Sequence, residues 1–139
     1  MSSKLGLFRL ANCGYAIPVE RLLRIVDCGF STALPLIPSF MAGMLVLDDE
    51  IVPLLDSNWL PEVVAGKSLS ASFKILITTE YGSVALPADA TVGILEEDRC
   101  VRITSDQETA KFVSDSIRYR DSCYQVIDID LFMMSLIRP

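Results

Sequence analysis

The sequence contains no histidine among its 139 residues. Histidine is the commonest general acid or base near neutral pH and the commonest imidazole metal ligand, so its absence excludes Ser-His-Asp and Cys-His catalysis. The four cysteines, Cys13, Cys28, Cys100 and Cys123, form no C-x-x-C pair of the kind that indicates a zinc or redox site. We interpret them as reduced thiols, most of them in or near the core. No catalytic residue, metal or cofactor is predicted.

Basic residues and long apolar runs are also scarce. Twelve Lys and Arg stand against 18 Asp and Glu, which gives a net charge of −6. Nucleic-acid binding depends on Lys and Arg contacts to phosphates, so neither DNA nor RNA is an expected partner. No apolar run reaches the roughly 18 residues that a membrane span needs, and residues 1–4 do not start a signal peptide. With 51% hydrophobic residues, the chain is expected to form one cytoplasmic domain with its own core.

Short apolar and β-branched runs separated by turn residues predict an all-β fold. Strands are expected at residues 5–10, 15–19, 22–26, 44–47, 51–55, 73–78, 83–86, 91–95, 101–103 and 124–129. Two prolines predict a crossing loop over 31–38, and one helical turn is expected over 38–41, ended by Gly43. Residues 106–116 are polar enough for a loop or a marginal helix, and 131–137 have helical potential.

An internal repeat links the two halves of the chain. Residues 16–20 (AIPVE) match residues 85–89 (ALPAD) at an offset of 69 positions, and residues 25–27 (IVD) match 94–96 (ILE) at the same offset. A repeat at about half the chain length indicates two related β units. We therefore expect two small barrels rather than one sandwich.

Five motifs in order carry a family resemblance. Residues 8–10 (FRL), 15–19 (YAIPV), 34–35 (LP), 38–43 (PSFMAG) and 51–56 (IVPLLD) together resemble the CheW-like family of bacterial chemotaxis coupling proteins. The first half fits from Leu5 to Ser57, residues 73–95 resemble the second half, and residues 98–121 fit poorly.

The resemblance implies a single CheW-like domain over residues 1–139. Its fold would be two intertwined five-stranded SH3-like β-barrels with short helical turns and a C-terminal helical segment. The approximate barrel halves would be residues 5–60 plus the C-terminal segment, and residues 72–104.

The same resemblance implies a non-catalytic adaptor between two partners, a chemoreceptor tip and the regulatory domain of a histidine kinase. It places Leu22, Thr91 and Ile94 beside a groove between the barrels, where a receptor helix hairpin would bind. The alternative is that Leu22 and Ile94 are ordinary core residues. On the kinase side, the resemblance implies the strands around one turn, with Met44, Val46, Asp49, Glu50 and Ile51 as contacts.

That turn departs from the family pattern. The family usually carries Asn-Leu-Arg-Gly where this chain has Val-Leu-Asp-Asp at residues 46–49, and a Glu where this chain has Arg24. We therefore predict that Arg24 and Asp48 form an ion pair across neighbouring strands, with both signs reversed; the alternative is two separate solvated charges. Asp49 replaces the family glycine, and Asp tolerates positive φ better than most residues, at some cost.

Two other functions stay open at this point. Asp48, Asp49 and Glu50 could bind a hard cation or act as general acids in a small enzymatic or ligand-binding barrel. The chain could also be a diverged adaptor of a pilus or other motility pathway. The sequence alone does not separate these possibilities.

Overall fold

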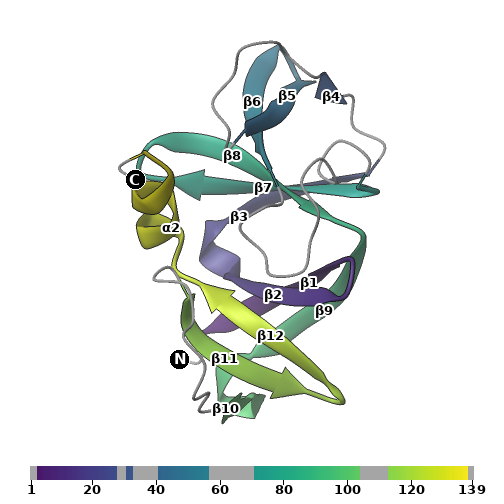
Figure 1. Ribbon diagram of the computed structural model, residues 1–139, viewed down its shortest axis with the longest axis vertical. Helices are drawn as coiled ribbons and strands as arrows, with labels where there is room; N and C mark the ends of the chain where they lie inside the picture. Colours follow the sequence, from purple (N-terminus) through teal and green to yellow (C-terminus); the bar gives the residue numbers. More distant parts are fainter. Residues whose placement is uncertain (1–2, 28–30, 33–40, 57–70, 104–112, 138–139) are drawn as a thin grey trace.

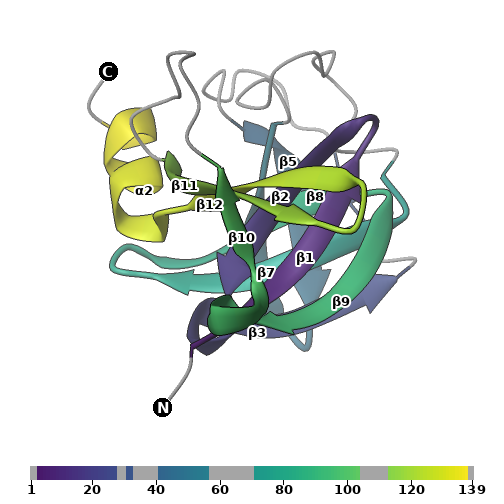
Figure 2. The same cartoon turned by 90° about the horizontal axis from the view of Figure 1, so that it is seen from below.

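The computed structural model describes residues 3–27, 31–32, 41–56, 71–103 and 113–137. Their strands form two six-stranded sheets, with one helix, α2 (Ile129–Ile137), after the last strand. Along the longest axis of the molecule, β4, β5 and β6 lie at one end and β10, β11 and β12 at the other (Figure 1). Figure 2 shows α2 at one side of the molecule, following β12.

The first sheet, here called sheet A, has the order β10-β11-β12-β2-β1-β9. Its strands are β1 (Lys4–Leu10), β2 (Cys13–Pro18), β9 (Ala90–Glu96), β10 (Val101–Ile103), β11 (Val113–Tyr119) and β12 (Ser122–Ile127). Sheet B has the order β3-β7-β8-β6-β5-β4. Its strands are β3 (Leu22–Asp27), β4 (Ser31–Thr32), β5 (Met41–Leu47), β6 (Glu50–Leu55), β7 (Phe73–Thr79) and β8 (Gly82–Ala88). Two short 3₁₀ turns, η1 (Val19–Arg21) and η2 (Glu97–Arg99), precede β3 and β10.

The two sheets are built by the same plan. Reading sheet A from β9 to β10 and sheet B from β3 to β4, each strand meets a counterpart about 70 residues away in the chain. The β1–β2 hairpin joins the late strands in sheet A, and the β7–β8 hairpin joins the early strands in sheet B. The expected pair of intertwined barrels is therefore confirmed, with a short sixth strand in each sheet. Each sheet takes strands from both residues 5–60 and residues 72–104, and sheet A also takes the late strands β11 and β12.

The exchanged hairpins explain why some strands are buried on both faces. In β1, Leu5 and Leu7 point into one barrel, whereas Phe8 and Leu10 point into a central cluster between the sheets. The central cluster is the largest, and α2 contributes Phe132 to it. Such strands read as nearly continuous apolar runs, which is why the sequence located them well.

Three predicted segments differ from the structure. Ser31 and Thr32, expected in a crossing loop, form the short edge strand β4, and residues 33–38 of that segment lie outside the described part. Met41 already belongs to β5, and Gly43 lies inside that strand instead of ending a helical turn; residues 38–40 lie outside the described part. Strand β11 occupies the end of the 106–116 segment, and residues 104–112 are outside the described part. Only one of the seven residues of β11, Ile117, is fully buried, so the other positions can be polar. A strand with one buried side chain carries almost no alternation signal.

The C-terminal helix is confirmed and starts slightly earlier than expected. Asp128 precedes α2, and its Oδ1 accepts a hydrogen bond of 3.1 Å from the backbone N–H of Leu131. A side-chain acceptor of this kind satisfies one of the free N–H groups in the first helical turn. The helix then packs Phe132 and Met133 against the central cluster.

Candidate binding surfaces

A cleft of about 190 Å³ lies where the edge strands of the two sheets, β3 and β9, meet over β1. The residues that line it come from these three strands: Gly6, Leu7, Phe8, Leu22, Ile25, Thr91, Gly93 and Ile94. The structure thus brings together all three residues expected at the receptor groove, Leu22, Thr91 and Ile94. Their role in binding a receptor stays a prediction.

Exposure distinguishes the two apolar residues of that set. Ile94 is 65% exposed, so it is not a core residue. Leu22 is half-buried and packs against the central cluster, so it has both a core contact and a face in the cleft. A Cβ at Gly6 would lie 2.8 Å from Leu22 Cδ1, so the glycine lets Leu22 settle against β1. The cleft is therefore an apolar groove with an exposed apolar rim.

A second surface is the outer face of the β5–β6 hairpin. Val46 pairs with Ile51 and Met44 with Pro53 across the two strands, so these four apolar side chains share one face. Val46 is 57% exposed and Ile51 is 62% exposed, whereas Leu45 and Val52 point into the barrel. Met44 is half-buried. The predicted kinase contacts therefore lie together on one hairpin, and their contact with a kinase stays a prediction.

The turn of this hairpin has the positive φ angles expected where the family pattern has a glycine. Asp48 and Asp49 have φ angles of 50° and 66°. Two consecutive left-handed residues are typical of the tight turn that favours Asn-Gly or Asp-Gly, so Asp49 holds a position suited to glycine. Asp49 and Glu50 are both exposed beside Val46 and Ile51. The hairpin thus ends in a negative tip next to an apolar face.

Arg24 and Asp48 are brought together. Arg24 Nη1 lies 2.8 Å from Asp48 Oδ2, and the side chains are 53% and 83% exposed. The two residues do not lie on neighbouring strands, and that part of the prediction was wrong. Arg24 lies on β3 and Asp48 follows β5, and these strands are not hydrogen-bonded to each other. Three strands, β7, β8 and β6, separate β3 from β5 in the order of sheet B. The sheet must therefore curve into a barrel to bring Arg24 and Asp48 together. An ion pair this exposed stabilises a fold by about 0–1 kcal/mol.

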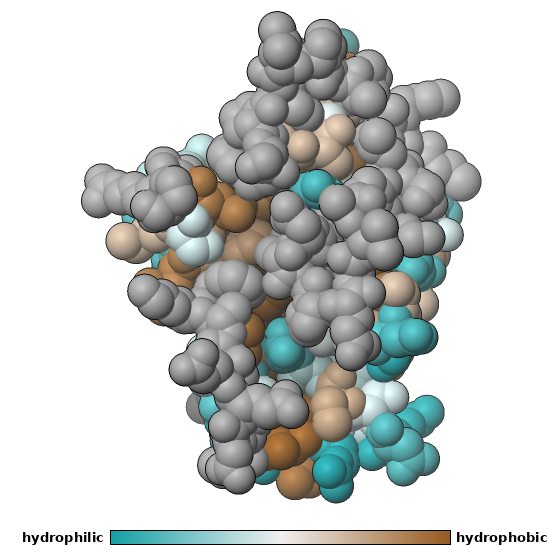
Figure 3. Space-filling view, in the orientation of Figure 1, coloured by the Kyte–Doolittle hydropathy of each residue, from teal (hydrophilic) through white to brown (hydrophobic). Residues whose placement is uncertain are grey.

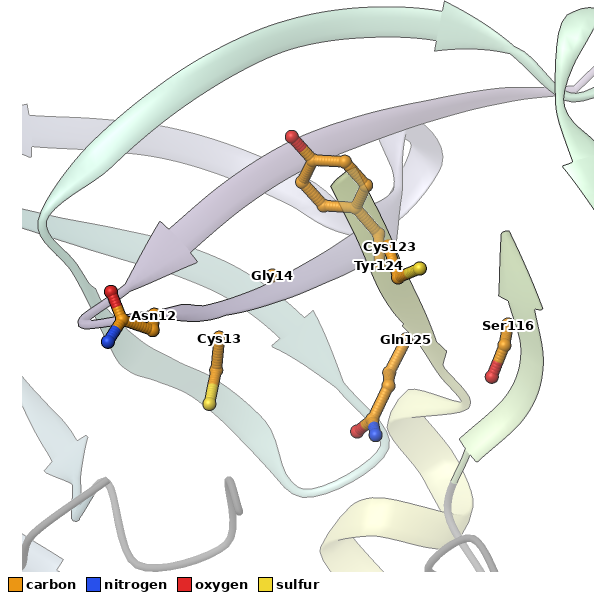
Figure 4. A pocket seen from close by; sticks show the side chains of 7 residues that line it. All are labelled: Asn12, Cys13, Gly14, Ser116, Cys123, Tyr124 and Gln125. Atoms are coloured by element: carbon orange, nitrogen blue, oxygen red, sulfur yellow. The ribbon is translucent and has the colours of Figure 1, made fainter. Parts of the chain in front are cut away.

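A hollow on sheet A was missed by sequence reasoning. It has a volume of about 200 Å³ and is lined by Asn12, Cys13, Gly14, Ser116, Cys123, Tyr124 and Gln125. Figure 4 shows the side chains of Cys13, Ser116 and Gln125 pointing to one side of the sheet and the Tyr124 ring to the other. A Cβ at Gly14 would lie 2.7 Å from both Cys123 O and Tyr124 Cδ1, so β2 and β12 approach closely there. No sequence pattern signals it, since it depends on a parallel pair of distant strands.

A third, polar cavity lies between η1 and the start of α2. Arg21 Nη2 lies 2.8 Å from Asp130 Oδ2 at this cavity, so an ion pair links the two elements. Asp130 Oδ1 is buried and has no hydrogen-bond partner among the residues that the structure describes. We interpret this ion pair as a structural contact that holds η1 against the start of α2.

Two buried groups in the core, Tyr15 and Lys74, have shifted pKa values. Burial raises the pKa of Tyr15, whose hydroxyl donates a hydrogen bond of 2.7 Å to Pro87 O, and the charge of Asp89 raises it further. Burial lowers the pKa of Lys74, which is 3% exposed and donates to Ala71 O, while Asp89 opposes that shift. Catalytic sites usually place such groups in a cleft. These two groups belong to the packing of the barrels.

The three acidic residues of the β5–β6 turn, Asp48, Asp49 and Glu50, do not point to one common binding position. Asp48 is paired with Arg24, and Asp49 and Glu50 are exposed. Within the described ranges, no three His, Cys, Asp or Glu side chains gather so that they could hold a metal ion. Likewise, in the part of the chain that the structure covers, no helix has the length and apolarity to cross a membrane.

Comparisons with known proteins agree on one fold. The family model of the CheW-like domain matches residues 4–135. A solved structure described as the scaffolding protein TtCheW from Thermoanaerobacter tengcongensis superposes with a TM-score of 0.74. It is 22% identical in sequence, and the match covers 94% of this chain and 92% of that one. No curated protein matches the sequence significantly.

Proposed function

Because the chain belongs to the CheW-like domain family, we propose that it is a non-catalytic cytoplasmic adaptor that couples chemoreceptors to a histidine kinase. The observation that carries the proposal is the separation of two apolar surfaces. One is the cleft between the barrels, and the other is the outer face of the β5–β6 hairpin. An adaptor needs two sites that can be occupied at once, and these two lie on different elements.

The cleft suits the tip of a chemoreceptor. A helical hairpin presents apolar side chains at helical spacing, and such helices dock in grooves with an apolar floor. Leu7, Phe8 and Leu22 supply that floor, and Ile94 supplies an exposed anchor on the rim. Thr91 adds a hydroxyl beside it.

The hairpin suits the regulatory domain of the kinase. Val46 and Ile51 form an exposed apolar pair on a rigid two-stranded element. Exposed aliphatic side chains of this kind are common anchors of protein interfaces when charged residues surround them. Asp49 and Glu50 provide such a rim and make it negative.

Two variants test the proposal, and each is the control of the other. Ile94→Glu and Ile51→Glu place a charge at apolar side chains that are 65% and 62% exposed, so both proteins should fold. We expect Ile94→Glu to weaken binding to the receptor tip by roughly tenfold or more and to leave kinase binding unchanged. Ile51→Glu should have the reverse effect.

Binding is measured by titration calorimetry with the cognate receptor fragment and the cognate kinase regulatory domain. Circular dichroism establishes that both variants are folded. Equal losses for both partners in both variants contradict the assignment of separate sites, and absence of binding by the unmodified protein contradicts the adaptor function itself.

A further inference from the structure

Helix α2 has one face in the core and an apolar face at the surface. Phe132 and Met133 pack in the central cluster. Leu131 and Met134 are instead 46% and 42% exposed. Side chains three residues apart are neighbours on a helix, so Leu131 and Met134 form a short apolar stripe. Hydrophobic residues are visible at the surface on the side of the molecule where α2 lies (Figure 3).

The apolar stripe leads to the polar cavity at the start of the helix. Asp128 precedes Leu131 by three residues, and its Oδ1 accepts a hydrogen bond from the backbone N–H of Leu131. Asp128 also lines the cavity, which has a volume of about 260 Å³. The stripe and the cavity are therefore parts of one surface, here called the α2 surface.

The cavity end of the α2 surface is acidic. Four carboxylates and one guanidinium line the cavity: those of Glu20, Glu97, Asp128 and Asp130, and that of Arg21. The guanidinium of Arg21 already pairs with Asp130. Within the described ranges, no Lys or Arg forms an ion pair with Glu20, Glu97 or Asp128. Four negative groups against one positive group favour a positively charged partner.

A partner for the α2 surface must suit both the acidic cavity and the apolar stripe. Anionic lipids and nucleic acids do not, because the carboxylates repel their phosphates. A single metal ion would leave the stripe uncovered, and no three acidic side chains of the described residues gather to hold one. A second copy that met this face across a two-fold axis would bring the same negative charges against it. A protein helix with apolar side chains and a Lys or Arg suits both parts.

We propose that the α2 surface binds a basic amphipathic helix of a partner protein. The apolar side of that helix packs on Leu131 and Met134, with side chains that meet at helical spacing. A Lys or Arg at one end of the helix enters the cavity, where its charged group lies among Glu20, Glu97 and Asp128. Opposite charges fix the direction of the partner helix, because the acidic cavity lies at one end of the stripe.

The α2 surface is separate from the two surfaces of the proposed adaptor. None of the residues that line its cavity lines the apolar cleft, and α2 lies apart from the β5–β6 hairpin (Figure 1). The proposal therefore goes beyond the receptor and kinase contacts and assigns a third partner.

Designed peptides test the α2 surface on the purified chain. The probe is a fluorescent amphipathic peptide of about 18 residues, roughly five helical turns, with Leu on one face and Lys on the other. One comparison peptide has Glu in place of every Lys, and another has the same residues in an order without an apolar face. Fluorescence anisotropy measures binding at low and at high salt.

Two double variants each remove one part of the α2 surface. Leu131→Gln/Met134→Gln removes the apolar stripe, and Glu20→Gln/Glu97→Gln removes two charges of the cavity. Asp128 is left in place because its carboxylate caps α2. Circular dichroism checks that both variants fold.

Two control variants make the same kinds of change elsewhere. Tyr81→Gln/Val101→Gln removes apolar side chains that are 49% and 62% exposed, and Glu50→Gln/Glu80→Gln removes two exposed charges. The unmodified protein and both controls should bind the Lys peptide equally well, and each variant of the α2 surface should bind it about tenfold or more weakly. High salt should reduce the loss in the cavity variant and preserve the loss in the stripe variant.

Absence of binding by the unmodified protein overturns the proposal, and so does equal binding of the Glu peptide or of the peptide without an apolar face. Controls that weaken binding as much as the α2 variants place the peptide on another surface, which also overturns it. Sedimentation velocity of the chain alone detects a second copy as the occupant: self-association that Leu131→Gln/Met134→Gln abolishes contradicts the proposal. Receptor and kinase are absent from these measurements, so failure here leaves the adaptor function to its own test.

Discussion

Asp49 shows how one residue can fix a turn at a cost in stability. Its φ of 66° lies in the left-handed region, where a Cβ is disfavoured and glycine is not. Asp49→Gly should therefore raise the free energy of unfolding by about 0.5–1 kcal/mol, after the added freedom of the unfolded chain is subtracted. Urea denaturation of both proteins measures this. A loss of stability would show that the Asp49 side chain contributes a contact that outweighs the strain of its backbone.

The Arg24–Asp48 pair permits a second measurement at this scale. Because both side chains are mostly exposed, Arg24→Glu should lower the free energy of unfolding by less than about 1 kcal/mol. Asp48→Arg should cost more, because position 48 has a φ of 50°, which Asp tolerates better than Arg. The double exchange should recover the part of the loss that comes from the ion pair. A double-mutant cycle in urea gives the coupling energy, and a cycle whose losses simply add shows that the two charges do not interact.

Charge reversal was readable from the sequence, and the hollow near Cys123 was not. Arg24 and Asp48 stood out because both differ in sign from the family pattern, so one change suggested the other. Cys13 and Cys123 line one hollow only because β2 and β12, which are far apart in the sequence, pair in parallel. No local pattern encodes that pairing, since parallel strands depend on tertiary contacts.

At the scale of elements, strand β11 and the start of β5 mark the limit of pattern reading. In β11 Ile117 is the fully buried residue, and in β5 Gly43 lies within the strand where glycine suggested an end. Gly43 is buried and pairs with Leu54 in the sheet register. By contrast, β1 and β7 were located well because both of their faces are buried.

The charge of the β5–β6 hairpin leads to a prediction about partner choice. Like charges at a docking surface disfavour a partner, so a kinase that suits a basic turn should bind this protein poorly. Asp48 is neutralised by Arg24, which leaves Asp49 and Glu50 as the repelling groups. Asp49→Gly/Glu50→Val should therefore raise affinity for such a kinase regulatory domain by about tenfold at low salt, and by less at high salt, where the charges are screened.

Calorimetric titrations at two ionic strengths measure this gain, with Glu80→Val in the β7–β8 turn as the control. Tight, salt-insensitive binding of the unmodified protein to a kinase of this type would contradict the prediction. In that case the apolar pair Val46 and Ile51 would set the affinity without help from the turn.

At the scale of the whole molecule, the repeat of 69 residues was visible in the sequence, but the exchange of hairpins was not. The matching segments 16–20 and 85–89 end β2 and β8, which are equivalent strands of different sheets. Similarity between halves shows that two units are related. It does not show which strands pair, because β1–β2 beside β12 and β1–β2 beside β6 bury similar apolar faces.

Two buried groups, Lys74 and Tyr15, should make the stability of the whole molecule depend on pH in the alkaline range. The folded state lowers the pKa of Lys74 below its ordinary value of 10.5, so folding favours its neutral form. Between the two pKa values the unfolded chain binds more protons, and the free energy of unfolding rises with pH. Tyr15 acts in the opposite sense. Its pKa is raised above 10.0, so stability is full below that pH and falls above it, as the unfolded chain ionises.

Lys74→Met and Tyr15→Phe separate these two effects. Urea denaturation at a series of pH values should show a rise approaching pH 10 in the unmodified protein that Lys74→Met lacks, and a decline above about pH 10 that Tyr15→Phe lacks. Because each comparison is a difference between profiles, the shared titration of surface groups cancels. A rise that persists in Lys74→Met would place its origin in another group. That result would mean that the lysine inside the barrel of sheet B keeps its ordinary proton affinity through its bond to Ala71 and the charge of Asp89.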